Sequence, residues 1–363
     1  MKLSLFLYPV LAFALVALLM PLARKGAKAL GFVDEPGGRK RHEGAVPPVG
    51  GLVIFPVFML FGLIGVTLPQ LWFYLALGVL LIMGALDDRV CVPPFVKFTI
   101  QWIAALIIIM PGCATVHHMG DLLGFGPINW GQAGGIIFSA VAAVLLINAI
   151  NLMDGLDGLA GGEGFVALFW MAVCCLLSGH ASEAFLPLLL MGALAGFLLH
   201  NMRHPWCRRA RVFLGDSGSL SLGLSLGWFA MRLSQGGAPA IKPVTVAWFL
   251  ALPIYDTCGQ FVRRISQGRH PFDADHNHFH HHLINAGMPA GRATFVIVML
   301  SFILGLIGIA GAWLNLPDYV MAYSWTALLL MHVYMSLRPH RFRRLVMRLR
   351  GKMTAAPEGR AAS

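Results

Sequence analysis

The sequence carries very little charge for its length. Only 12% of its 363 residues are Asp, Glu, Lys or Arg, about half the share typical of a soluble domain, whereas 58% are hydrophobic. This composition excludes an ordinary soluble globular protein. The apolar runs are long and do not alternate with polar residues, so they predict helices and not the strands of a closed barrel. The predicted fold class is an all-α polytopic integral membrane protein.

Several motifs of other protein classes are also missing. The six cysteines form no Cys-x-x-Cys pair, and no His-Glu-x-x-His stretch of a zinc protease is present. The sequence has no internal repeat, which argues against a transporter built from duplicated halves. The net charge is +11, but no basic and aromatic platform accompanies it, so we expect no nucleic-acid partner. The basic residues suit membrane lipid of an anionic leaflet and anionic substrates.

About eleven apolar runs approach the roughly 20 residues that a membrane-spanning helix needs. They cover residues 3–22, 48–67, 71–86, 95–111, 133–150, 164–178, 184–200, 212–231, 243–260, 293–313 and 317–336. The first run resembles a signal peptide, but it is long enough to span and basic residues follow it, so we expect an uncleaved span. We predict one transmembrane unit, residues 1–336, and a basic cytoplasmic tail, residues 337–363.

The distribution of positive charge orients these spans. With a periplasmic N-terminus and a cytoplasmic C-terminus, all but three of the 27 Lys and Arg residues face the cytoplasm; the exceptions are Lys2, Arg232 and Lys242. The acids divide in the same way, since only Asp121, Glu183 and Asp318 of 16 lie outside. We therefore expect the chemistry in the cytoplasmic loops, residues 23–47, 87–97, 151–163, 201–211 and 261–292. Only Cys113 would face an oxidising side, so no disulfide is expected.

Two adjacent acids, Asp87 and Asp88, end the third run. Acids at a membrane edge are costly, which makes them candidates for function; the alternative is that they only stop a span at the water boundary. A richer motif ends the fifth run, where Asn148 and Asn151, like Asp154 and Asp157, share a helix face through their spacing of three. Glycines at 155, 158, 161 and 162 allow close approach of a ligand, so a ligand or metal pocket is favoured over a merely capped helix end.

Two further motifs follow. Asp216, in Gly-Asp-Ser-Gly-Ser at the start of the eighth run, suits either a hard cation such as Mg²⁺ or a helix cap made by Asp216 or Ser217. The loop after the ninth run contains His276, His278, His280, His281 and His282. These histidines favour a transition-metal site, or a phosphate site shared with Arg263, Arg264 and Arg269, over a merely solvated loop. Asp256, inside the ninth run, is expected to pair with an arginine or to line a cavity.

Carboxylates for Mg²⁺, amides, and basic groups for phosphate at one membrane face together indicate phosphoryl transfer. A rival from another class is a transition-metal transporter whose histidine loop acts as a cytosolic sensor. The near absence of charge inside the spans, apart from Asp256, argues against that rival.

Four ordered stretches carry a family resemblance over essentially the whole chain. They are LDD at 86–88, NAINLMDGLDGLAGG at 148–162, RVFLGDSGS at 211–219 and DHNHFHHHL at 275–283. The chain resembles the polyprenyl-phosphate N-acetylhexosamine-1-phosphate transferases. Through DEPGGRKRH at 34–42 and SQGRHPFDADHNHFHH at 266–281, it is most similar to the bacterial enzymes of this family that use undecaprenyl phosphate and UDP-N-acetylglucosamine.

The resemblance implies transfer of a sugar 1-phosphate to undecaprenyl phosphate in the bacterial inner membrane, the first step of a lipid-linked glycan such as O-antigen. UDP-N-acetylglucosamine is the default donor, with other UDP-N-acetylhexosamines open, and a homodimer is also open. The implied catalytic set is Asp87, Asp88, Asp154, Asp157 and Asp216. Asp216 and Asn151 would hold Mg²⁺, or Mn²⁺, and Asp87 would orient or deprotonate the lipid phosphate. The implied substrate-binding set is Asn148, Asn151, Asn201, Arg263, His278, His280, His281 and His282.

One position departs from the family pattern. Many relatives carry a third acid shortly after the aspartate pair, but Cys91 or Val92 stands there in this chain. A metal site that needs that third carboxylate is therefore not expected.

Overall fold

A computed structural model describes residues 2–34, 44–64, 67–271 and 278–354. The described chain is built almost entirely from helices, with one short hairpin of β1 (His118–Gly120) and β2 (Ile128–Asn129). The helices are α1 (Lys2–Ala29), α2 (Gly50–Gly62), α3 (Leu68–Val90), α4 (Pro94–Ile109), α5 (Gly131–Met153), α6 (Leu159–Leu177), α7 (Phe185–Asn201), α8 (Gly215–Ser234), α9 (Pro243–Phe249), α10 (Ala251–Ser266), α11 (Phe279–Asn285), α12 (Ala290–Trp313), α13 (Asp318–Leu337) and α14 (Pro339–Thr354).

Six of the described helices are long and apolar enough to cross a membrane, namely α1, α3, α5, α6, α12 and α13. The shorter helices α2, α4 and α7 are also apolar. The prediction of an all-α multi-pass membrane protein is therefore confirmed.

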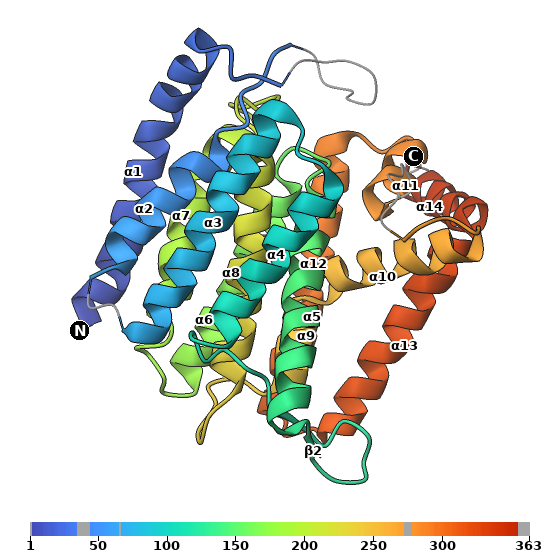
Figure 1. The fold of residues 1–363 in the computed structure, drawn as a ribbon. Helices are drawn as coiled ribbons and strands as arrows, with labels where there is room; N and C mark the ends of the chain where they lie inside the picture. Colours follow the sequence, from blue (N-terminus) through green and yellow to red (C-terminus); the bar gives the residue numbers. More distant parts are fainter. Residues whose placement is uncertain (1, 35–43, 65–66, 272–277, 355–363) are drawn as a thin grey trace, which may run out of the picture.

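Helix α8 forms the centre of the bundle and packs against α2, α3 and α5 (Figure 1). Almost every residue from Ser217 to Ser234 is buried. Its glycines and serines permit this, because small side chains let helix backbones approach closely within a membrane. A Cβ added at Gly223, for example, would lie 2.5 Å from the Cα of Ile147 on α5. The start of α8 is thereby fixed relative to three neighbouring helices.

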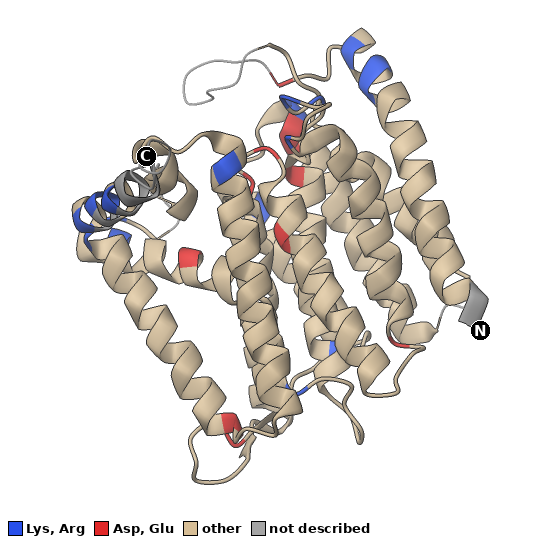
Figure 2. Ribbon diagram, turned by 180° about the vertical axis from the view of Figure 1, so that it is seen from behind, with Lys and Arg blue, Asp and Glu red and all other residues tan. Residues whose placement is uncertain are grey.

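The ends of α3, α5 and α7 and the starts of α4, α6 and α8 lie on one side of the molecule, the upper side in Figure 1. Most of the acidic and basic residues lie on that side, as Figure 2 shows. The hairpin of β1 and β2 lies on the opposite side. The chain thus brings the charged loops to one end of the bundle.

The prediction of one span over residues 243–260 is wrong, because this run is divided into α9 and α10 at Leu250. Pro253 lies in the first turn of α10 and has no N–H to donate to the carbonyl of Phe249. Figure 1 shows α10 running across the direction of its neighbours. The predicted tail, residues 337–363, contains the helix α14 in its described part.

Parts of two predicted motifs lie outside the described residues. These parts are residues 35–43 of the first basic loop and residues 272–277, which include Asp273, Asp275 and His276.

Candidate functional site

The acid pair of α3 meets the start of α8. The Asp88 carboxylate accepts hydrogen bonds from the backbone N–H groups of Asp216, at 2.9 Å, and Ser217, at 3.3 Å. The first N–H groups of a helix have no partner within it, so Asp88 supplies the cap from another helix. Of the two alternatives for Asp216, the helix cap made by Asp216 or Ser217 is wrong, because α8 already begins at Gly215.

Glycines make this contact between helices possible. A Cβ on Gly84 of α3 would collide with the backbone of Ser217, and one on Gly51 of α2 would collide with the backbone of Gly218. The backbones of α2 and α3 therefore press directly against the first turn of α8. This close packing fixes the distance between the acid pair and Asp216.

A lysine joins the carboxylates. Lys97 of α4 forms an ion pair with Asp87, and its Nζ lies 3.7 Å from Oδ2 of Asp216. Asp87 is 6% exposed, and its Oδ1 also accepts the Val92 N–H at 2.8 Å. Our list of candidate residues missed Lys97; the available signal was a single basic residue in the apolar run that follows the acid pair.

The turn after α3 supplies a second partner for Asp87. Cys91 has a left-handed backbone, with φ of 53°, and it ends the helix. This turn directs the Val92 N–H back to Asp87. The position expected from the family pattern to carry a third acid thus lies in the turn that holds Asp87.

Asn151 and Asp216 lie together, as the family resemblance implies for a shared site. The Asn151 Nδ2 donates to Oδ1 of Asp216 at 2.8 Å and to Oγ of Ser219 at 2.9 Å. The amide oxygen of Asn151 and the carboxylate of Asp216 are both ligands that Mg²⁺ prefers. Asn148, one turn earlier on α5, donates to Oε1 of Gln101 at 2.6 Å and to the Val144 carbonyl.

Asp154 follows directly after α5 and forms an acid cluster with Asp216, Asp88 and Asp157. Desolvation by the surrounding protein, followed by the negative charges of these three residues, raises its pKa to about 8. The side chain also reaches solvent. The acid cluster concentrates negative charge and favours a proton or a cation.

The residues fit a magnesium ion that a substrate helps to hold. No three His, Cys, Asp or Glu side chains in the described part of the chain are arranged to bind a metal alone. Mg²⁺ in enzymes usually takes only one or two carboxylates and completes its shell with water and substrate phosphates. Asp216 and Asn151, beside Asp87 and Asp154, match that donor set.

Asp157 and Asn201 hold two loops together. Asp157 pairs with Nε of Arg203 at 2.7 Å and accepts the Ala210 N–H at 3.3 Å. The buried Asn201 accepts the Gly158 N–H at 2.7 Å and donates to the Val212 carbonyl at 2.9 Å. These contacts join the loop after α5 to the loop after α7.

The histidine motif forms the N-terminal turn of α11. Asp256 of α10 accepts hydrogen bonds from Nδ1 of His278 and from the Phe279 N–H, both at 2.8 Å. Nε2 of His332, on α13, lies 3.8 Å from Oδ1 of Asp256. Asp256 was expected to pair with an arginine or to line a cavity, and the structure pairs it with histidines. It ties α11 to α10 and α13.

His280 brings this motif next to Gly155, the residue after Asp154. Its Nε2 is buried without a hydrogen-bond partner among the described residues, and a Cβ added at Gly155 would collide with it. Burial, followed by neighbouring His281, lowers the pKa of His280 to about 3. Burial, followed by Arg263, lowers the pKa of His282 to about 4. Both imidazoles are therefore neutral at pH 7 and offer N–H donors without charge.

The predicted site residues thus divide into two sets. Asp87, Asp88, Asn151, Asp154 and Asp216 converge with Lys97, and His280 reaches them at Gly155. Arg263 of α10 and His282 of α11 are buried apart from them, and Arg263 donates to Oε1 of Gln260 at 2.7 Å. The ring of His281 lies beside that of His280, with ring centres 4.1 Å apart and the planes tilted by 35°.

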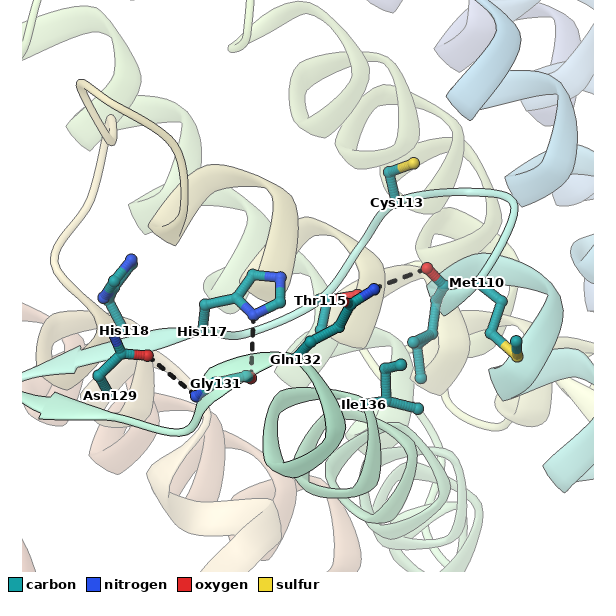
Figure 3. A pocket seen from close by; sticks show the side chains of 10 residues that line it. Met110, Cys113, Thr115, His117, His118, Asn129, Gly131, Gln132 and Ile136 are labelled. Atoms are coloured by element: carbon teal, nitrogen blue, oxygen red, sulfur yellow. Dashed lines mark hydrogen bonds between the residues drawn. The ribbon is translucent and has the colours of Figure 1, made fainter.

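A cavity of about 540 Å³ lies at the other end of the molecule, beside the hairpin (Figure 3). Its lining includes His117, Asn129 and Gly131, and Figure 3 shows the first two bonded to the backbone of the third. None of the predicted site residues lines it. We therefore assign the candidate site to the place where five motif residues meet, and not to this cavity.

Comparison with known proteins shows which family the chain resembles. The family model described as glycosyl transferase family 4 matches residues 70–234, which include the acid pair, Asn151 and Asp216. The chain is 30% identical to the undecaprenyl-phosphate alpha-N-acetylglucosaminyl 1-phosphate transferase of Escherichia coli (strain K12), over 94% of this chain and 93% of that protein. It is 32% identical to the protein of the same name from Pasteurella multocida (strain Pm70), over 96% and 97%.

Proposed function

This chain belongs to glycosyl transferase family 4, and on that premise we propose that it transfers N-acetylglucosamine 1-phosphate from UDP-N-acetylglucosamine to undecaprenyl phosphate. The enzyme is a phosphoglycosyl transferase in a multi-pass membrane fold. The observation that carries the proposal is the meeting of Asp87, Lys97, Asn151 and Asp216 from α3, α4, α5 and α8 at one end of the bundle. The relatives' names supply the donor and acceptor.

In the proposed reaction, an oxygen of the lipid phosphate attacks the β-phosphorus of the UDP-sugar. The bond from this phosphorus to the bridging oxygen breaks, and UMP leaves with that oxygen and its electron pair. The sugar C1–O bond is not broken. The products are undecaprenyl-diphospho-N-acetylglucosamine and UMP.

The main barrier is the approach of two anions, which catalysis must offset by positioned positive charge. Lys97 supplies such a charge, and Asp87 fixes its ammonium group beside Asp216. A phosphate monoester is already largely ionised at pH 7, so no strong base is required. Asp87 is engaged by Lys97 and by the Val92 N–H, which favours an orienting role over proton transfer.

Asp216 and Asn151 would hold Mg²⁺ on the diphosphate, where it would neutralise developing charge. His280 would donate its neutral N–H to a phosphate oxygen, since its Nε2 lies at the Gly155 turn. We place the site on the cytoplasmic side of the bacterial inner membrane, supported by the gathering of charge at this end of the bundle. There the product would start a lipid-linked glycan such as O-antigen.

The test uses purified protein with undecaprenyl phosphate and a panel of UDP-N-acetylhexosamines, with UMP and the lipid product as readouts. We expect UMP release with UDP-N-acetylglucosamine that requires Mg²⁺ or Mn²⁺. Asp216→Asn should lower turnover by at least about a hundredfold, whereas Asp121→Asn on the outer hairpin should not. Faster turnover with another donor would reassign the sugar. No UMP release with any UDP-sugar would refute the proposed reaction.

A further inference from the structure

The turn between α13 and α14 concentrates positive charge beside a small cavity. This cavity has a volume of about 260 Å³ and is lined by Leu337, Arg338, Pro339, His340, Arg341 and Arg344. It shares no residue with the site at Asp87 and Asp216. Nothing in the proposed reaction uses it.

The charge at this turn continues along one side of α14. Arg341, Arg344 and Arg348 are exposed and are spaced by three and four residues, so they share one strip of the helix. The sequence has no Asp or Glu between Asp318 and Glu358, so this segment carries no carboxylate of its own. Arg341 Nη1 donates to the Tyr334 hydroxyl at 2.8 Å, which holds the guanidinium at the turn.

The cavity lies where the last apolar helix ends. Leu330, Met331, Tyr334 and Leu337 of α13 are exposed and form an apolar surface that leads up to the turn. On α14, Val346 is buried in the same apolar cluster as Leu283 of α11. Helix α14 is therefore amphipathic, with one side packed on the protein and an arginine strip left open beside a membrane-facing helix.

We propose that this turn binds the phosphate headgroup of an anionic phospholipid in the inner leaflet. Guanidinium groups match phosphate in charge and in the geometry of their N–H donors. Basic amphipathic helices beside a span bind anionic lipid surfaces. The proposal rests on the cytoplasmic orientation proposed above, but not on the identity of the transferred sugar.

The position of α14 gives the bound lipid a structural consequence. Helix α14 packs against α11, which carries His280. Arg343 lies close enough to His282 to influence its charge. A headgroup that binds α14 would therefore also stabilise the position of α11.

Native mass spectrometry of the full-length protein in detergent, titrated with phosphatidylglycerol or phosphatidylcholine, tests the site. The test variant is Arg341→Gln with Arg344→Gln. The matched control is Lys25→Gln with Lys28→Gln. It removes two exposed positive charges from the C-terminal end of α1. We expect the unaltered protein to prefer phosphatidylglycerol. The test variant should bind it about 30-fold more weakly, at about fivefold per basic residue, and the control should bind like the unaltered protein.

Three results would overturn the proposal. The first is an equal loss in the control, which would show a general effect of net charge. The second is equal binding of phosphatidylcholine by the unaltered protein. The third is a raised KM for undecaprenyl phosphate in the test variant, measured in neutral lipid, which would assign the turn to the substrate. Arg338→Gln alone serves as a second variant if the double variant is unstable, with the same preference expected to weaken.

Discussion

At the scale of single residues, Lys97 is the side chain whose charge the site depends on most directly. It is paired with Asp87 and lies 3.7 Å from the Asp216 carboxylate. Lys97→Met should lower kcat by at least about a hundredfold, because the approach of two anionic substrates would lose a fixed positive charge. Steady-state UMP release measures this effect. Lys242→Met, which removes an ion pair on the opposite face, is the control, and equal activity of the two variants would contradict the role of Lys97.

The buried His280 leads to a prediction about how the stability of the protein depends on pH. Its folded-state pKa of about 3 lies below the ordinary value of 6.5, so acidification protonates the unfolded chain first. Stability should therefore fall as the pH decreases from about 6.5 toward 3, by about 2 kcal/mol between pH 7 and pH 5 from this residue alone. The thermal midpoint should drop less over this range in His280→Gln than in the unaltered protein. His118→Gln, on the outer hairpin, should keep the full drop, and an unchanged drop in His280→Gln would oppose this account.

Sequence motifs predicted the composition of the site better than the roles of its members. Asp87, Asn151 and Asp216 could be assigned because each ends or begins an apolar run on the same side of the membrane. The role of Asp88 could not, because its partners are backbone N–H groups far away in the chain. Lys97 was missed because one lysine in a membrane protein is readily explained by topology alone.

At the scale of elements, α11 depends on one buried acid. Asp256 accepts both the His278 side chain and the Phe279 N–H. Asp256→Ala should loosen this turn, because a buried histidine and the start of α11 would lose their acceptor. Hydrogen–deuterium exchange should then become at least about tenfold faster in residues 278–286, at a cost of about 1.4 kcal/mol or more in local stability. Helix α12 should exchange as before, and unchanged exchange in α11 would refute the tether.

The break in the ninth run shows the limit of hydropathy for placing elements. Residues 243–260 are apolar enough to be predicted as one span, although they include Pro253. Its missing N–H allows a change of direction at Leu250, but does not require one, since Pro9, Pro21 and Pro56 lie within continuous helices. The deciding factor is the packing of α10 on α13 and α5, which no local pattern contains.

At the scale of the whole molecule, two native cysteines can test the orientation. Cys91 follows the acid pair, Cys113 precedes the hairpin at the other end of the bundle, and both are exposed. In variants that retain one of the two, a membrane-impermeant maleimide added to intact spheroplasts should label Cys113. It should label Cys91 only after the membrane is opened. The reverse pattern would invert the proposed topology and move the site to the periplasmic side.

The distribution of Lys and Arg predicted which loops lie on the same side of the membrane. It could not predict which of these loops contact one another. The loops after α3, α5 and α7 do gather at one end. Their exact juxtaposition follows from backbone contacts at Gly51 and Gly84, and the sequence alone does not show which helices will meet there.

The cap that Asp88 provides has a consequence for biosynthesis. Asp88 and Asp216 are 128 positions apart in the chain. During insertion, the acid pair enters the membrane with α3 long before its N–H partners on α8 have been translated. The acid cluster therefore remains incomplete until α8 joins α2 and α3 in the bilayer. A nascent chain that stalls before this helix has no catalytic centre, so activity begins only when the core of the bundle has closed.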